Sequence, residues 1–215
     1  MKILLVSATK FEVFPLGHRL SKVRGKDHVW NYKTSKHSVD LLVTGVGMTA
    51  TAYELGRTLS GKYDLAVNIG VAGSFRKKIA LGSVVSVKSD RFADMGAEDG
   101  NRFLTLEEMG LSNGSWKLED ESWKDKKALS GLKKVKGITV NTVHGNSASI
   151  KKVMKKFNPD IETMEGAAFF YACDRMGIPC LQIRAISNYV ERRNKKNWQL
   201  NLAIRNLSHG LLPHR

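Results

Sequence analysis

The order of hydrophobic and polar positions along the chain predicts strands that alternate with helices. Short apolar runs that end at glycine or polar residues indicate buried strands, and apolar residues that recur every three or four positions indicate helices. We expect strands at residues 2–8, 40–44, 64–69, 83–88, 138–143 and 179–186. We expect helices at residues 12–20, 48–59, 147–157, 165–176 and 198–211.

This alternation predicts an α/β protein whose sheet carries helices on both faces. Residues 89–137 interrupt the alternation because they are mostly polar, and we expect them to form a long irregular excursion from the scaffold. The chain has 215 residues, of which 42% are hydrophobic. This length and composition are sufficient for a single domain over residues 1–215 with a substantial core.

The cysteines and the N-terminus indicate where the protein works. Cys173 and Cys180 lie in apolar surroundings without the spacing of metal ligands, so we expect both to be reduced. The apolar run at the N-terminus is too short for a secretory segment, and no later stretch is long enough to cross a bilayer. We therefore expect a cytoplasmic protein without a metal site.

Basic residues outnumber acidic ones and give the chain a net charge of +15. Lysines gather at residues 124–136 and at Lys151, Lys152, Lys155 and Lys156, where helical spacing predicts an exposed face. A solvated surface is the favoured interpretation, because nucleic-acid sites interleave aromatic with basic residues and these clusters contain almost no aromatic residues. Attraction of a small anionic substrate is an alternative.

Candidate functional residues follow the predicted strands. Glu12 follows the first strand, Gly45–Gly47 and Gly70–Gly73 follow two others as turns, and Asn188 follows the last long strand. Ligands of α/β proteins bind at the carboxyl ends of strands. Glu165 lies where a loop turns into an apolar helix. Each residue alone also fits a structural role, as a first-turn carboxylate, a turn glycine or a capping amide.

The combination of motifs is more informative than any one of them. The motifs are Ala8-x-x-x-Glu12, Gly45-Val46-Gly47, Asn68-x-Gly70-x-Ala72-Gly73, Met164-Glu165-Gly166-Ala167-Ala168 and Arg184-Ala185-Ile186-Ser187-Asn188. In this order they resemble the nucleoside phosphorylase/nucleosidase superfamily, most of all the branch that includes methylthioadenosine/S-adenosylhomocysteine nucleosidase. Within that branch, DRFADMGAED, TMEGAAFFYAC and IRAISNYVERRN resemble the futalosine hydrolases.

This resemblance covers nearly the whole chain and is looser between residues 100 and 137. It implies a single-domain, three-layer αβα fold with a central mixed, partly barrel-like sheet, as in nucleoside phosphorylases. It also implies a homodimer or larger homo-oligomer, a purine nucleoside and water as substrates, and no cofactor, metal, nucleic acid or membrane partner.

The resemblance further implies how the site residues act. Glu12 would activate water, and Met164 and Glu165 would hold the ribose. Negative charge near the sugar and a base for water suit an oxocarbenium-like transition state. The remaining substrate contacts would come from Ser187, Gly47, Val71, Ala72, Gly73, Ala148, Ser149 and Trp198.

Asn188 departs from the methylthioadenosine nucleosidases, which carry an aspartic acid that protonates the departing adenine. An amide has no proton to give, but it donates N–H hydrogen bonds. A 6-oxopurine offers two neighbouring acceptors, so Asn188 favours hypoxanthine, released from futalosine on a menaquinone route. Binding of adenine through the amide oxygen stays open, and so does a methylthioadenosine/S-adenosylhomocysteine nucleosidase activity.

Phosphorolysis by a purine nucleoside phosphorylase is the nearest competing chemistry. It is disfavoured, because residues 8–11 contain no arginine or glycine to hold phosphate. A non-catalytic nucleic-acid-binding module is a distant alternative. Base stacking is unassigned between Phe92 and Tyr189. Arg192 and Arg193 either steer an acidic aryl group or form a solvated pair, and the latter is favoured.

Overall fold

The computed structural model describes residues 1–17, 21–26, 29–33, 37–118 and 131–211. The strands are β1 (Lys2–Ser7), β2 (Ser21–Lys26), β3 (Val29–Lys33), β4 (Ser38–Val43), β5 (Leu65–Ser74), β6 (Val84–Arg91), β7 (Gly96–Asp99), β8 (Arg102–Thr105), β9 (Ser115–Lys117), β10 (Lys133–Thr139), β11 (Ile161–Thr163) and β12 (Cys180–Tyr189). The helices are α1 (Lys10–Gly17), α2 (Met48–Thr58), α3 (Ser147–Phe157), α4 (Gly166–Met176) and α5 (Leu200–Leu211), with a short 3-10 helix, η2 (Lys195–Asn197).

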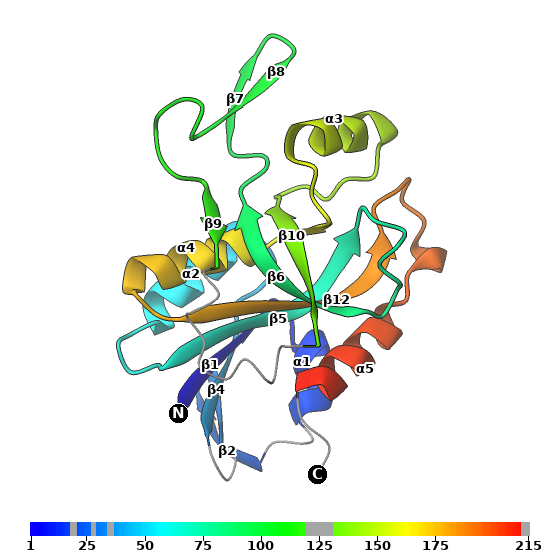
Figure 1. Ribbon diagram of the computed structural model, residues 1–215. Coiled ribbons are helices and arrows are strands. Elements are labelled where there is room, and N and C mark those ends of the chain that lie inside the picture. Colours follow the sequence, from blue (N-terminus) through cyan, green and yellow to red (C-terminus); the bar gives the residue numbers. More distant parts are fainter. Residues whose placement is uncertain (18–20, 27–28, 34–36, 119–130, 212–215) are drawn as a thin grey trace.

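Ten of the described strands form one mixed sheet in the order β11-β10-β6-β12-β5-β1-β4-β3-β2, with β9 paired to β6. β11 pairs a second time, antiparallel to β5. This pairing closes β5, β12, β6, β10 and β11 into a barrel, which confirms the expectation of a mixed, partly barrel-like sheet. β7 and β8 form a separate hairpin that projects from one end of the molecule (Figure 1).

Helices cover both faces of the sheet, as the alternation predicts. Side chains point to opposite faces along a strand. On β1, Leu4 and Val6 pack into one core with Phe169 of α4, whereas Leu5 packs into another core with Leu207 of α5. α2 and α4 contact each other, and so do α1 and α5 (Figure 1). Each helix pair therefore buries one face of the central strands.

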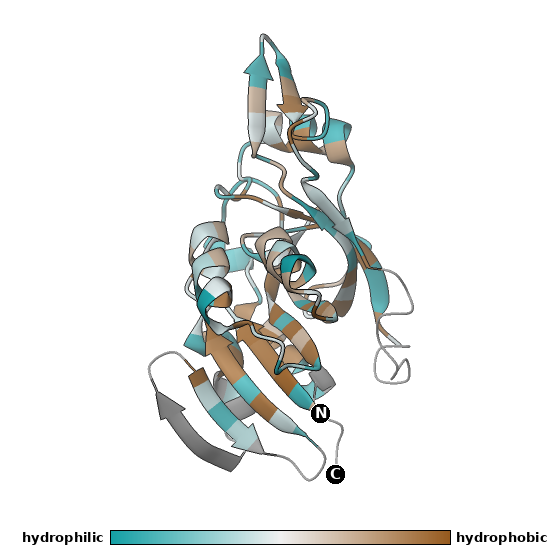
Figure 2. Cartoon of the chain, turned by 90° about the vertical axis from the view of Figure 1, so that its left-hand side faces the viewer, coloured by the Kyte–Doolittle hydropathy of each residue, from teal (hydrophilic) through white to brown (hydrophobic). Residues whose placement is uncertain are grey.

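The surface and the interior separate as the composition predicts. Hydrophobic residues gather on the central strands (Figure 2). Lys151, Lys152, Lys155 and Lys156 of α3 are all exposed. Cys173 is fully buried. None of the helices in the described parts of the chain combines the length and the hydrophobicity that crossing a bilayer requires.

Three predictions about local structure are wrong, because pairing between distant segments overrides the local pattern. Gly70–Gly73 is the end of β5 rather than a turn, since β12 pairs on one side of it and β11 pairs at Gly73 on the other. Asn188 lies within β12 rather than after a strand. Residues 89–137 contain β7, β8, β9 and the start of β10, with 119–130 outside the described residues.

The boundaries of the other elements agree with the predictions or differ from them by a few residues. α3 has the predicted bounds, whereas α5 begins at Leu200 instead of residue 198. α1 covers Lys10–Gly17, and residues 18–20 of the predicted helix lie outside the described residues. The strand expected at 138–143 is the end of β10, which stops at Thr139. No strand was predicted for β2 and β3, which extend the sheet beyond β4.

Candidate active site

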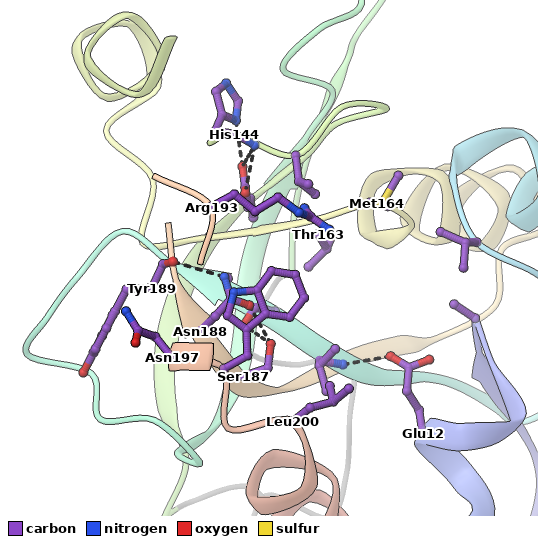
Figure 3. A pocket seen from close by; sticks show the side chains of 18 of the residues that line it. Glu12, His144, Thr163, Met164, Ser187, Asn188, Tyr189, Arg193, Asn197 and Leu200 are labelled. Atoms are coloured by element: carbon purple, nitrogen blue, oxygen red, sulfur yellow. Dashed lines mark hydrogen bonds and ion pairs between the residues drawn. The ribbon is translucent and has the colours of Figure 1, made fainter. Parts of the chain in front are cut away.

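A cavity of about 460 Å³ opens at the ends of β1, β5, β11 and β12. The segments that follow β1 and β11 line it, together with the last residues of β5 and β12 and parts of the segment from Glu191 to Leu200. Figure 3 shows Glu12 on one side of this cavity and His144, Ser187 and Asn188 on the other. The cavity therefore lies where ligands bind in α/β proteins.

Glu12 lies in the first turn of α1, where it is buried and held at both carboxylate oxygens. Oε2 accepts hydrogen bonds from Ser7 Oγ at 3.2 Å and from Thr9 N and Thr9 Oγ1, each at 3.0 Å. Oε1 accepts from the backbone N–H of Val71 on β5 at 3.0 Å. Four donors thus hold the carboxylate against the end of the sheet.

Glu165 directly precedes α4 and is also buried. Its Oε1 accepts from the backbone N–H of Gly47 at 3.1 Å. Gly47 has a φ of 98°, which favours glycine at this position before α2. Burial raises the pKa of Glu165 above its ordinary value, the nearby Arg184 guanidinium opposes that rise, and the Glu12 carboxylate adds to it. The two carboxylates are therefore close enough to interact.

Arg184 of β12 lies beside both carboxylates and is fully buried. Its Nη1 is 3.9 Å from Glu165 Oε2. A Cβ on Gly70 would lie 2.5 Å from Arg184 Nη1 and 2.7 Å from Glu12 Oε1, so both groups use the space that this glycine leaves open. Among the described residues, Nη1 has no hydrogen-bond partner. The guanidinium therefore lies buried behind the cavity wall, near both acids.

A chain of buried polar side chains holds this guanidinium from behind. Arg184 Nε donates to Gln182 Oε1 at 3.0 Å, and Arg184 Nη2 donates to Asn68 Oδ1. Gln182 Nε2 donates in turn to Asp90 Oδ2 at 3.0 Å, and Thr139 Oγ1 donates to Asp90 Oδ1 at 3.0 Å. Burial raises the pKa of Asp90 to about 6, against the effect of these donors. A further buried acid thus lies behind the site.

A β-bulge in β12 brings two polar residues to the cavity. Ile186 pairs with Ala72 of β5, but the next residue of β5, Gly73, pairs with Asn188. Ser187 is therefore an extra residue, and such bulges re-aim side chains next to active sites. Both Ser187 and Asn188 line the cavity as a result.

The hydrogen bonds of Asn188 orient its amide. Ser187 Oγ donates to Asn188 Oδ1 at 2.8 Å. Asn188 Nδ2 donates to the backbone oxygen of Tyr189 at 3.1 Å, which uses one of its two hydrogens. The second N–H is left to face a ligand.

His144 and Glu162 form a pair on the cavity wall beside Asn188. Glu162 of β11 is only 4% exposed. The backbone N–H of His144 donates to Glu162 Oε1 at 3.1 Å, and His144 Nδ1 lies 2.7 Å from Oε2. This wall thus carries a third buried carboxylate.

Aromatic residues border the opening of the cavity. Trp198 lines it from just before α5, and the Arg193 guanidinium lies 5.0 Å from the centre of the Trp198 ring. Tyr189 lines the cavity as well. Phe92 instead packs edge-on against Trp116 at 5.3 Å and is not part of the lining. Of the two stacking candidates, Tyr189 thus lines the cavity and Phe92 does not.

The structure brings most of the predicted site residues together. Those that line the cavity are Glu12, Val71, Ala72, Gly73, Met164, Glu165, Ser187, Asn188 and Trp198. Gly47 contributes its backbone N–H to Glu165. Ala148 and Ser149 lie outside the lining, because they form the first turn of α3 and their N–H groups bind Asn146 Oδ1.

Two residues of the site had no predicted role: Arg184 and Glu162. An arginine within an apolar strand is a usable signal, because a buried charge requires a partner. Glu162 carries no such signal, since only the pairing of β11 with β5 brings it to the cavity. Within the described ranges, no three His, Cys, Asp or Glu side chains are grouped to hold a metal ion.

Comparison with known proteins identifies the family. The phosphorylase superfamily matches residues 2–210. A futalosine hydrolase of Acidothermus cellulolyticus is 30% identical over 180 residues, which are 80% of this chain and 73% of that protein. The structure of futalosine hydrolase of Helicobacter pylori has a TM-score of 0.83 at 15% identity and covers 98% of this chain and 96% of that chain.

A structure of a 5′-methylthioadenosine/S-adenosylhomocysteine nucleosidase of Colwellia psychrerythraea, in complex with adenine, is similar to the same degree. It has a TM-score of 0.81 at 21% identity, over 98% of this chain and 93% of that chain. Structural similarity at such low sequence identity shows the fold alone. The relatives found by sequence show which family within that fold the chain belongs to. The chain therefore belongs to the phosphorylase superfamily and, within it, to the futalosine hydrolase family.

Proposed function

We propose that this chain hydrolyses the N-glycosidic bond of futalosine, releasing hypoxanthine and dehypoxanthine futalosine on a menaquinone route in the cytoplasm. The observation that carries the proposal is the convergence of Glu12 and Glu165 on one cavity, beside the same Arg184 guanidinium. The sequence relatives that are named futalosine hydrolases support this choice of substrate.

Glu12 acts as the base for water in this proposal. Glu12 lines the cavity, so a water molecule at this end of it meets the carboxylate as an acceptor for its proton. Because the transition state of glycosidic bond cleavage is oxocarbenium-like, the water needs only to be positioned and relieved of a proton. The buried network behind Arg184 keeps this guanidinium in place near both carboxylates.

Glu165 binds the ribose. A carboxylate that accepts from sugar hydroxyls forms charge-assisted hydrogen bonds, and these strengthen as positive charge develops on the ring. Met164 offers an apolar surface to the sugar without competing for its hydroxyls.

Asn188 binds the departing base. One N–H of Asn188 remains beyond its bond to Tyr189, and in this proposal the amide turns this N–H toward the ligand while its oxygen binds Ser187. A 6-oxopurine has acceptors at N7 and O6, and both gain negative charge as the bond to the sugar breaks. This orientation therefore favours hypoxanthine over adenine as the leaving base.

A product assay tests the proposed function. The purified protein is incubated with futalosine, inosine or methylthioadenosine, each with and without phosphate, and the released base and sugar are separated by chromatography. We expect hypoxanthine from futalosine at a rate that does not depend on phosphate. A phosphate-dependent rate with ribose 1-phosphate as product would indicate a phosphorylase instead. Strong preference for methylthioadenosine would indicate the adenine-specific nucleosidase.

We also propose that the chain is a homodimer. Phe11, Val46 and Val143 line the cavity yet are 38–56% exposed, and Tyr53 of α2 is 63% exposed. Large apolar side chains gathered at a cavity mouth are typical of an interaction surface. Sedimentation at micromolar concentration should give twice the mass of one chain, and Tyr53→Glu should shift it toward the monomer. A monomeric wild-type protein would contradict this proposal.

A further inference from the structure

Asp90 of β6 is a buried carboxylate to which the proposed hydrolysis assigns no role. It is 1% exposed and lies outside the cavity lining. Its Oδ1 accepts from the backbone N–H of Arg91 at 2.8 Å and from Thr139 Oγ1 at 3.0 Å, and its Oδ2 accepts from Gln182 Nε2 at 3.0 Å. A buried carboxylate that accepts from several groups fixes the direction in which each of them points.

One connection runs from Asp90 through Gln182 to the site. Because Gln182 Nε2 donates to Asp90, the other end of the same amide, Oε1, is turned toward Arg184. This oxygen accepts from Arg184 Nε at 3.0 Å. Arg184 Nη1 lies in turn 3.9 Å from Glu165 Oε2. The carboxylate of Asp90 therefore determines which group the guanidinium meets on the side away from the cavity.

A second connection runs from Asp90 to the start of α4. Thr139 Oγ1 accepts from the backbone N–H of Ala167 at 2.8 Å while it donates to Asp90. Gly166 lets the carboxylate approach the helix this closely, because a Cβ on Gly166 would overlap with Asp90 Oδ2. Glu165 directly precedes this helix. Asp90 is thus linked both to the helix that follows Glu165 and to the guanidinium beside it.

We propose that Asp90 is a positioning residue: its carboxylate sets the direction of the Gln182 amide, and this amide holds the Arg184 guanidinium at the site. The guanidinium favours the ionised form of Glu165, which is the better acceptor for ribose hydroxyls. This inference rests on the proposed function and deepens it, because it assigns part of the control of Glu165 to a residue outside the cavity.

The direction of the amide depends on the charge at position 90. The N–H of Arg91 can only donate, so an asparagine in place of Asp90 would keep its oxygen toward Arg91 and turn its NH2 group toward Gln182. Gln182 would then present its oxygen to that group and its own NH2 to Arg184 Nε, which also donates. Two donors that face each other in a buried site are strongly disfavoured, so the guanidinium should move away.

Moving the charge by one link tests this relay. At pH 8 Asp90 is ionised, because its pKa is raised only to about 6. Under this condition Asp90→Asn should lower kcat/KM for futalosine at least about tenfold. Adding Gln182→Glu supplies a carboxylate that accepts both from the asparagine amide and from Arg184 Nε, and should restore kcat/KM to within about threefold of the wild type.

Asp40→Asn is the matched control for the loss of a buried acid. Asp40 is also buried, accepts from Tyr63 Oη at 2.9 Å and lies outside the cavity lining, so kcat/KM should not change. If the folded double variant is as slow as Asp90→Asn alone, the inference is overturned.

The position of Arg184 is also measured without turnover. In protein labelled with 15N at arginine Nε, the variant Arg184→Lys identifies the Arg184 signal by its loss. We expect this N–H to exchange slowly with water in the wild type and in the double variant, and rapidly in Asp90→Asn. If Asp90→Asn does not fold, Gln182→Met, which removes the acceptor at similar volume, should also give rapid exchange.

An unchanged Arg184 signal in either variant overturns the inference. Failure of the wild-type protein to cleave futalosine would instead overturn the proposed function alone, because the Arg184 signal requires no substrate and still decides whether Asp90 holds the guanidinium.

Discussion

Glu12 and Glu165 bring like charges into one cavity but occupy different environments. Four hydrogen-bond donors surround Glu12, whereas Glu165 has a backbone N–H at one oxygen and the guanidinium of Arg184 near the other. Two carboxylates in unlike surroundings are suited to two different tasks in one reaction. The following predictions separate those tasks.

Replacing Glu12 by glutamine should lower kcat about a thousandfold and change KM only a few-fold. The amide keeps the shape of the side chain but takes no proton from water, and a positioned base contributes about 10²–10⁴ in rate. Steady-state kinetics on futalosine measure the effect. Glu54→Gln is the control, because Glu54 of α2 pairs with Arg57 outside the cavity lining, and it should retain the full rate. If the Glu12 variant kept more than a tenth of kcat, Glu12 would not be the base.

The pH dependence of kcat/KM should report the ionisation of Glu165. Because burial raises its pKa above the ordinary 4.5, Glu165 loses its charge at a higher pH than a solvated glutamate does. The protonated form is a poorer acceptor for ribose hydroxyls, so activity should fall as pH drops, with an acid limb above 4.5. The limb should persist in Asp90→Asn, which removes the other buried acid with a raised pKa. A limb at or below 4.5 in the wild type would contradict this assignment.

Among the elements, α3 tests whether the segment after His144 serves the fold or the substrate. Asn146 caps this helix by accepting from the N–H groups of Ala148 and Ser149. Asn146→Ala should lower the free energy of unfolding by about 1 kcal/mol, whereas Asn146→Ser retains a capping oxygen and should cost little. Since Ala148 and Ser149 lie outside the cavity lining, kcat/KM should change less than twofold. A tenfold loss of kcat/KM without loss of stability would instead indicate that Ala148 and Ser149 contact the substrate. Urea denaturation and kinetics on the same samples measure both.

Elements with strong local signals were predictable from the sequence. α3 has the predicted bounds, because Asn146 begins it and Asn158 ends it in the left-handed conformation. The end of β5 was not predictable, since its glycines are typical of a turn and only pairing with β12 and β11 makes them a strand. β2 and β3 were not predictable for the same reason, because β2 pairs with β3 and β3 pairs with β4.

Some residues of the candidate site were predictable from the sequence and others were not. Glu12, Glu165 and Asn188 are parts of recognisable motifs, and the structure places them in one cavity. The bulge at Ser187 is invisible in the sequence, because it exists only relative to the register of β5. Glu162 was missed for the same reason, since its strand has only three residues and its neighbours come from elsewhere in the chain.

At the scale of the whole molecule, surface charge and buried charge affect stability differently. The net charge of +15 is carried largely by lysines, and on α3 these are exposed to water and to salt. Asp90 is instead buried at the centre of the barrel strands, where β6, β10 and β12 meet. Its ionisation should therefore dominate the local dependence of stability on pH.

Asp90→Asn should change how stability depends on pH. In the folded protein the pKa of Asp90 is raised from 3.8 to about 6, so between these values the folded state holds a proton that the unfolded chain has released. The stability from this group is full below about pH 4 and is lost as pH rises through 6. Asparagine does not titrate, so the variant should gain roughly 3 kcal/mol relative to the wild type between pH 4 and 7. Urea denaturation at fixed salt gives the difference. A difference that stays constant with pH would contradict this.

β5 carries no side chain at Gly73, so the wall of the cavity is in part bare backbone. Side chains from β11, β12 and α1 line the cavity around this backbone. The side chains that face a ligand and the bare backbone at Gly73 thus belong to different elements of the fold. We therefore expect that exchanging a residue on one of these flanking elements changes which nucleobase is accepted while the backbone of β5 stays unaltered.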